Sequence, residues 1–148
     1  MSKIIARDNQ CYCINFRRAA NTLTKFYDRV FAPFHLTTSQ FSLLNDIHLL
    51  GSCNKSELAQ FSRLDRTAVI RSLSVLYEKG LIEDETEVGS RNRGVRLTKA
   101  GKSAIKEGMP GWKDAQKQIR SILGDENILA LKQVFADIEK LNEVDILK

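Results

Sequence analysis

Two capping boxes and a third helix-start signal stand close together between residues 37 and 65, and this succession most limits how the chain can fold. Thr37 is followed three residues later by Gln40, and Asn54 by Glu57, so each pair can satisfy two otherwise unbonded backbone N–H groups at a helix start. Asp65 is a further favourable N-cap. Only a short helix fits between Asn54 and Asp65, so the spacing predicts a short helix, a tight turn and a second helix.

Apolar residues that repeat at helical intervals extend this pattern in both directions. A first helix is predicted from about residue 10 to 32, where Pro33 ends it. The helix that starts at Thr37 is expected to end at Gly51. In the first helix Phe16, Ala20, Leu23, Tyr27 and Val30 repeat at helical intervals. In the helix after Asp65, which Gly80 ends, Val69, Leu73 and Leu76 mark the predicted buried stripe.

Two short segments with strand-like residues follow, "LIEDETEV" at 81–88 and "GVRLT" at 94–98, and the glycine-flanked tip between them predicts a two-stranded hairpin. Thr98 is placed to cap a long helix that runs to Leu123, with a kink or break expected near Pro110. A C-terminal helix carries an apolar stripe that a monomer of this size is not expected to bury. Its residues are Ile128, Leu131, Phe135, Ile138 and Leu141.

Positive charge is concentrated in and after the predicted hairpin. From Val88 to Lys106 the chain has six lysines or arginines and no acidic residue, and "GSRNRGVRLTKAG" alone holds four basic side chains and three glycines. The whole chain of 148 residues has a net charge of +5 and a pI near 9.2, and its 43% hydrophobic residues suffice for the core of one domain. This distribution indicates a polyanionic partner.

The sequence gives no sign of an enzyme, a metal centre or a membrane protein. It shows no signal-peptide pattern and no apolar run of spanning length, so a cytoplasmic location is expected. Cys11, Cys13 and Cys53 are too few for a disulfide framework, and His35 and His48 show no ligand spacing with them, so neither zinc nor another cofactor is expected. Nothing resembles a catalytic triad or a phosphate-binding loop.

The order of these elements is that of a winged helix-turn-helix, so the predicted fold class is mainly α with a small β-hairpin. The helix after Asp65 is apolar on one side and carries side chains on the other that can reach base edges and phosphates in a major groove. The hairpin tip is slim enough to enter a minor groove, where arginine is attracted by the negative potential. The predicted DNA-binding residues are Ser56, Arg63, Arg66, Thr67, Arg71, Ser74, Arg91 and Arg93.

Three segments, "LTTSQFSLL", "KSELAQFSRLDRTAVIRSLSVLYEKGLIE" and "SRNRGVRLTKAG", resemble the MarR family of bacterial transcriptional regulators in sequence, order and spacing. The resemblance implies a homodimer in which long helices from 1–36 and 99–148 interleave, while two winged domains, each 37–98, read a palindromic double-stranded operator. It also implies a repressor that a small ligand or an oxidised cysteine releases from DNA. The family's wing-tip arginine falls on Arg91, and Gly89 stands where the family usually has an aspartate.

The first predicted helix also carries a candidate sensor. Cys13 falls where the organic-peroxide-sensing branch of the family has its reactive cysteine, and Tyr27 matches a tyrosine that this branch places near the thiol. Arg17 stands in place of the second tyrosine of that arrangement. The resemblance therefore implies Cys13, Tyr27 and neighbouring Cys11 as redox-responsive or ligand-responsive residues, whereas Cys53 is expected to be a small buried side chain. A non-redox ligand between dimerisation helices and winged domain is the alternative.

A second interpretation is a winged helix that binds other proteins without sequence-specific DNA binding, since the fold does not dictate DNA recognition. The wing separates the two interpretations. A protein-interaction module has no reason to keep Arg91, Arg93 and Arg96 free of acidic neighbours.

Overall fold

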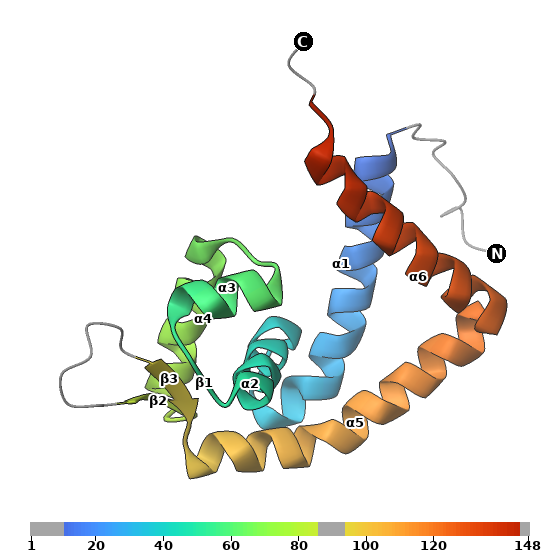
Figure 1. Ribbon diagram of the computed structural model, residues 1–148. Coiled ribbons are helices and arrows are strands. Elements are labelled where there is room, and N and C mark those ends of the chain that lie inside the picture. Colours follow the sequence, from blue (N-terminus) through green and yellow to red (C-terminus); the bar gives the residue numbers. More distant parts are fainter. Residues whose placement is uncertain (1–10, 86–93, 146–148) are drawn as a thin grey trace. The chain divides into compact units, whose positions relative to one another are not determined.

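The computed structural model describes residues 11–85 and 94–145, and within it the chain divides into two compact units, 1–111 and 112–148. Within the described ranges, no helix is both long enough and apolar enough to cross a membrane. In chain order the elements, labelled in Figure 1, are α1 (Tyr12–Phe31), η1 (Ala32–Phe34), α2 (Thr38–Leu50), β1 (Ser52–Cys53), α3 (Lys55–Ser62), α4 (Arg66–Glu78), β2 (Ile82–Glu85), β3 (Gly94–Leu97), α5 (Lys99–Leu123), α6 (Asp125–Glu139) and η2 (Lys140–Glu143).

The helix starts of the first unit follow the capping signals in the sequence. Thr37 and Asn54 form the predicted capping boxes at α2 and α3, with both reciprocal bonds present in each. Asp65 accepts a 2.9 Å hydrogen bond from the backbone N–H of Ala68 at the start of α4. Gly51 ends α2 with a φ of 79°, a backbone conformation that residues with a Cβ rarely adopt. These predicted boundaries are confirmed.

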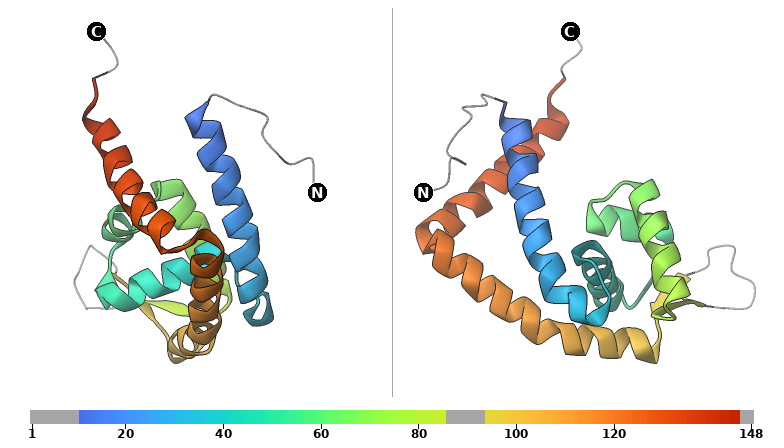
Figure 2. Two further views of the ribbon diagram at one scale, coloured as in Figure 1. Left: turned by 90° about the vertical axis from the view of Figure 1, so that its right-hand side faces the viewer. Right: turned by 180° about the vertical axis from the view of Figure 1, so that it is seen from behind.

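The predicted helix-turn-helix is also present. α3 and α4 contact each other and α2, and Figure 2 shows α3 and α4 side by side on the far side of α2 from α1. The connection from α3 to α4 is short because Arg63 turns the chain in the left-handed region, with a φ of 53°. The mainly helical winged fold predicted from the sequence is therefore confirmed.

One apolar core holds the first unit together. The rings of Phe31 and Phe41 stack with centroids 4.1 Å apart, which joins the end of α1 to α2. Asp28 on α1 adds a polar link, because its Oδ1 accepts bonds from both the backbone N–H and the hydroxyl of Thr38, at 2.7 and 2.6 Å. The most deeply buried side chains of the core are Phe31, Leu43, Leu44, Ile47, Leu58, Val69, Leu73, Leu76 and Val95.

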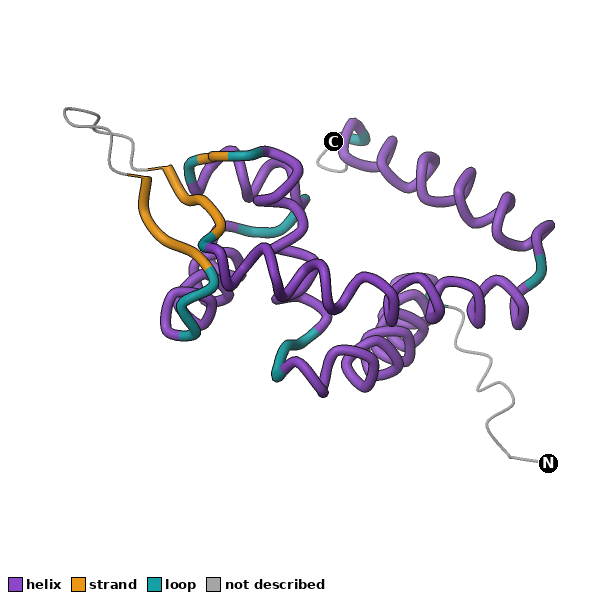
Figure 3. Tube along the Cα trace, turned by 90° about the horizontal axis from the view of Figure 1, so that it is seen from below, coloured by secondary structure: helices purple, strands orange, loops and turns teal. Residues whose placement is uncertain are grey.

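The sheet has three strands, not the two of the predicted hairpin (strands are orange in Figure 3). β2 and β3 pair antiparallel as expected, and β1 adds to the other edge of β3, with Ser52 opposite Arg96. β1 was not predicted, because two residues between a helix-ending glycine and an N-cap are too few to show a strand pattern. Cys53, predicted to be buried, is 3% exposed and lies opposite Val95 on this strand.

The long helix α5 starts where the sequence predicts but does not break at Pro110. The Thr98 hydroxyl accepts a 3.1 Å bond from the N–H of Gly101 and so caps the helix, which then continues through Pro110 to Leu123. The expected break is wrong, because proline removes only one backbone hydrogen bond, the one to the Lys106 carbonyl. Both Pro110 and Lys106 are exposed, so water can solvate that carbonyl. The alternative expectation, a kink at Pro110 within a continuous helix, stays a prediction.

The second unit contains the end of α5 and α6, which meet at a sharp corner (Figure 1). Gly124 forms the corner with a φ of 81°, and an ion pair of 3.1 Å between Arg120 and Asp125 spans it. The predicted C-terminal stripe lies on α6 and the turn after it, where Phe135 is 55% and Leu141 64% exposed.

Close approach to the backbone of another segment requires glycine at position 101, in the first unit. A Cβ on Gly101 would overlap the backbone carbonyl oxygen of Leu81, which already accepts the N–H of Thr98. This contact fixes the start of α5 against the beginning of the β2 hairpin. A backbone oxygen in this position cannot rotate out of the way as a flexible side chain can.

We predict that Gly101→Ala destabilises the protein by about 1–3 kcal/mol, the usual cost of overpacking. Helix preference alone would give the opposite sign, since alanine is favoured over glycine within helices by about 1 kcal/mol. Urea unfolding at fixed protein concentration measures the difference, with Ser103→Ala, an exposed position of the same helix, as control. A Gly101→Ala protein as stable as the parent would contradict the packing described.

Candidate nucleic-acid interface

The fourth helix is held rigidly on one side. Val69 and Leu76 are fully buried and Leu73 is 1% exposed, so the predicted stripe is confirmed. The hydroxyl of Tyr77 donates a 2.5 Å bond to Asp84, which fixes the end of α4 to β2. Burial and the adjacent carboxylate raise the pKa of Tyr77 well above its usual value, so it remains a donor at any physiological pH.

The opposite side of α4 presents the predicted polar side chains to solvent. Thr67, Arg71 and Ser74 are all exposed, together with the apolar Ile70 between them. The Ser74 hydroxyl donates a 3.1 Å bond to the Ile70 carbonyl, so its proton is already used. Ser74 can therefore offer a partner an acceptor, whereas Thr67 and Arg71 have lengths and donors suited to base edges.

Three predicted residues lie on α3 and the turn before α4. Ser56 occupies the first turn of α3, and its backbone N–H donates to the Asn54 side chain at 2.9 Å. Its side chain is exposed, as are those of Arg63 and Arg66. Arg66 is the first residue of α4, where unbonded N–H groups and the helix dipole favour anions such as a phosphate.

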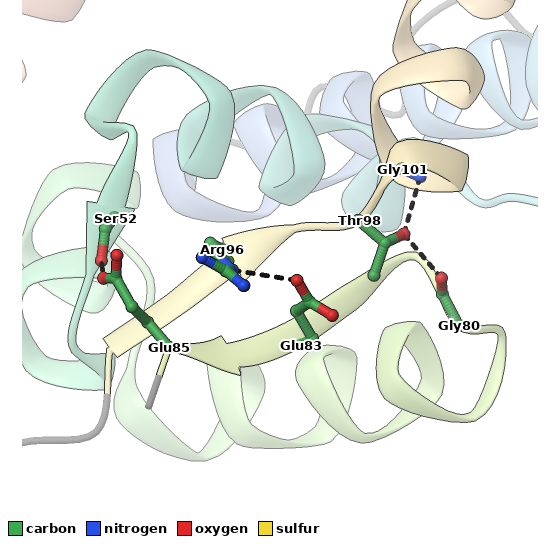
Figure 4. Close-up of polar contacts among 7 residues, drawn as sticks. All are labelled: Ser52, Gly80, Glu83, Glu85, Arg96, Thr98 and Gly101. Atoms are coloured by element: carbon green, nitrogen blue, oxygen red, sulfur yellow. Dashed lines mark hydrogen bonds and ion pairs between the residues drawn. The ribbon is translucent and has the colours of Figure 1, made fainter. Parts of the chain in front are cut away.

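The wing is described only at its base. Arg91 and Arg93 lie outside the described residues. The base is tied by polar bonds across the three strands, as Figure 4 shows: Glu85 accepts from Ser52, and Glu83 pairs with Arg96 at 2.9 Å. The expectation that Arg96 has no acidic neighbour is therefore wrong, because antiparallel pairing places Glu83 directly opposite it.

The candidate sensor residues are spread along α1. Cys11 is the N-cap residue, Cys13 lies in the first turn, and both are exposed. Tyr27 is at the other end of the same helix, where its ring stacks on Phe31 and burial raises its pKa. Since 14 residues of helix span about 21 Å, Cys13 and Tyr27 do not meet within one chain. A contact between them would need a second copy.

The buried Cys53 is chemically distinct from the other two cysteines. Burial, together with the nearby charges of Glu57 and Asp46, raises the pKa of its thiol to about 11. Asp46 itself has a raised pKa because it is partly buried, although the 2.8 Å bond from the Ser62 hydroxyl opposes that shift. Within the part of the chain that the structure describes, no cluster of three or more potential ligands could hold a metal ion.

Two polar links between helices were missed by sequence analysis, Asp28 to Thr38 and Asp46 to Ser62. Each joins residues ten or more positions apart, on different helices, so no local spacing reveals them. They fix α1 to the first residue of α2 and α3 to the second half of α2, and thus position the turn before α4.

Known structures contain the same arrangement. The chain matches the model of the MarR family over residues 36–91. A DNA complex of the Mycobacterium tuberculosis transcriptional regulator MosR is 32% identical, with 90% of this chain and 96% of that chain covered and a TM-score of 0.78. The chain belongs to the MarR family. Family membership makes it a transcriptional regulator and not an enzyme.

Solved structures with lower sequence identity share the fold. A mutant of Escherichia coli MarR bound to operator DNA is 21% identical, covering 85% of this chain and 94% of that chain, with a TM-score of 0.71. BpsR of Bordetella bronchiseptica, described with a mechanism for regulation of its DNA binding by 6-hydroxynicotinic acid, is 18% identical, covering 84% and 95%, with a TM-score of 0.74. No curated protein sequence matches the chain.

The three cysteines should differ in alkylation. At pH 8 a thiol whose pKa is about 11 is roughly one part in a thousand thiolate, so Cys53 should resist iodoacetamide in the folded protein. Exposed Cys11 and Cys13 should react within the same period. Peptide mass spectrometry before and after unfolding in urea measures this. Equal labelling of all three cysteines in the folded protein would contradict the described burial.

Proposed function

We propose that this MarR-family regulator is a cytoplasmic homodimer that binds palindromic operator DNA through α4 and the wing, and that it represses transcription until a small ligand or cysteine oxidation releases it. The observation that carries the DNA-binding part is the anchored α4. Its buried stripe and its bond to β2 hold it firmly, while Thr67 and Arg71 remain exposed on its other side. The DNA complex of the 32% identical MosR supports the same use of the fold.

Exposed apolar side chains outside the winged domain support dimerisation. On the first turns of α1, Tyr12 is 82% and Phe16 40% exposed, and around the α5–α6 corner Ile122 and Leu129 are 80% and 67% exposed. Large exposed apolar surfaces of this kind mark interaction sites, because burying them stabilises a complex by roughly 25 cal/mol per Å². We assign dimerisation to residues 1–36 and 99–148 and DNA reading to residues 37–98.

Arg71 and Arg91 should differ in their contribution to DNA binding. Arg71, in the middle of the exposed face of α4, is placed for base edges in the major groove, so Arg71→Ala should relax sequence preference and cost about 1–3 kcal/mol on the operator. Arg91, assigned to the wing tip from sequence, should contact a minor groove whose code is degenerate. Arg91→Ala should weaken binding to all sequences and reduce the salt slope by about one. Titrations of operator and random duplexes at several salt concentrations measure both.

Two further variants make the comparison specific. Arg71→Lys keeps the charge but loses the planar guanidinium that can contact a guanine bidentately. This variant should therefore bind random DNA like the parent but lose the preference for operator over random DNA. Lys106→Ala removes one exposed charge from α5 and should change neither property strongly. If Arg71→Ala and Arg91→Ala both bound operator and random DNA like the parent, the protein-interaction alternative would be favoured instead.

In the redox version of the proposed release from operator DNA, Cys13 is the residue that becomes oxidised. A thiolate attacks an organic hydroperoxide, releasing the alcohol and forming a sulfenic acid, and a second thiol then displaces water to give a disulfide. Cys11 and Cys13 are too close in sequence to pair comfortably within one helix, so the second thiol would belong to the partner subunit or to a small thiol. A disulfide at the start of α1 would add bulk or a covalent link where the dimer helices are proposed to pack.

Mild treatment with an organic hydroperoxide should therefore reduce operator binding by the parent, and a reductant should restore it. Cys13→Ser should keep its operator binding after the same treatment. Cys11→Ser, two residues away, is the matched control variant. Undiminished binding by fully oxidised parent protein would remove the sensing role and leave a non-redox ligand as the releasing agent.

A further inference from the structure

An apolar side chain lies in the middle of the side of α4 that faces solvent. Ile70 is 42% exposed, whereas Val69, the residue before it, is fully buried. Thr67 lies three residues before Ile70 and four before Arg71, and Ser74 lies four residues after Ile70. These spacings place all four exposed side chains on one face of the helix. Ile70 is thus an apolar member of the surface proposed to read DNA.

The orientation of the Ile70 side chain is largely fixed before any partner binds. In a helix the branch at Cβ restricts χ1 of isoleucine to one strongly preferred rotamer, so little side-chain freedom is left to lose on binding. The backbone is held as well, because the Ile70 carbonyl accepts the 3.1 Å bond from the Ser74 hydroxyl and Val69 is anchored in the core. Ile70 therefore presents an apolar group of defined shape at a defined place on α4.

The position of Ile70 along α4 places it among the proposed base contacts. Each residue advances a helix by 1.5 Å, so Thr67 to Ser74 spans about 10 Å, which corresponds to about three base-pair steps of roughly 3.4 Å. Ile70 and Arg71 differ by only about 1.5 Å along the helix axis. An α4 that brings Arg71 to a base edge in the major groove therefore brings Ile70 to the same base pair or to its neighbour.

The major groove offers an isoleucine one complementary chemical group. Base pairs present hydrogen-bond donors and acceptors there, and thymine adds its C5 methyl group. Isoleucine can neither donate nor accept, so covering a donor or acceptor removes a bond to water without replacing it, which costs free energy. Contact with a methyl group instead removes apolar surface of both partners from water, which is favourable. Ile70 therefore favours thymine over the other three bases.

We propose that Ile70 is a specificity-determining residue that selects a thymine in each operator half-site through the C5 methyl group of that base. The proposal rests on the proposed function, because it requires α4 to lie in the major groove. The role of Ile70 differs in kind from those of Thr67 and Arg71, which depend on hydrogen bonds to base edges. Removal of a single methyl group from the DNA abolishes the contact with Ile70 and leaves every hydrogen bond between the bases in place.

The test compares thymine with deoxyuridine in the bound DNA. The full-length protein first selects its operator from a random pool. Each thymine of that operator is then replaced in turn by deoxyuridine, which lacks the methyl group and keeps the same hydrogen-bonding groups. Dissociation constants are measured for the parent and two variants. Ile70→Ala removes the contact and keeps a residue that favours a helix, and Leu49→Ala removes an exposed apolar side chain from α2 as the matched control.

In the parent, replacing the contacted thymine of one half-site should weaken binding by about fourfold, the change that corresponds to the burial of one methyl group. This preference for thymine over deoxyuridine should disappear in Ile70→Ala and remain in Leu49→Ala. A purely structural role of Ile70 would instead weaken binding of both duplexes and leave their ratio as it is in the parent.

The inference and the proposed function fail through different results. An operator in which no thymine is sensitive to the replacement would overturn the inference alone. A preference that Ile70→Ala retains, or that Leu49→Ala also loses, would do the same. Failure of the parent to select any operator would overturn the proposed function, and this inference with it.

Discussion

Burial of one face of α4 is the interaction on which the rest of the winged domain depends. Val69, Leu73 and Leu76 insert into the core beside Leu44 and Ile47 of α2, and they are essentially inaccessible to solvent. Truncating one such leucine to alanine typically costs about 2–5 kcal/mol, a large part of the 5–15 kcal/mol that stabilises a domain. The same burial determines which side of α4 remains exposed, and therefore which side chains are available to DNA.

Charged side chains have a different role at the base of the wing from the one proposed for them on α4. The outer face of this base joins three strands through Arg96 with Glu83 and Ser52 with Glu85, so basic and acidic groups there serve the sheet. Strand pairing therefore gives Arg96, which belongs to the basic segment of the sequence, a structural role.

Much of the fold could be predicted because its signals are local. Thr37, Asn54 and Asp65 define helix starts through bonds that reach only three residues, and a helical repeat identifies the stripe on α4. Pairing across long separations could not be predicted in this way. β1, the Arg96–Glu83 pair and the Asp28–Thr38 link each join residues whose proximity only the folded chain creates. The exposure of Thr67 and Arg71 could be predicted, because they lie opposite the buried stripe of α4. The hydrogen bond from the Ser74 hydroxyl to the Ile70 carbonyl could not be predicted from that stripe.

The central claim is that two copies of this chain read DNA together. Selection of bound duplexes from a random pool tests it most directly, because the protein alone then determines the sequence recovered. The account predicts a palindrome whose half-sites lie about one helical turn, roughly 10 base pairs, apart. Recovery of duplexes without a shared sequence, or of a single unpaired half-site, would contradict it.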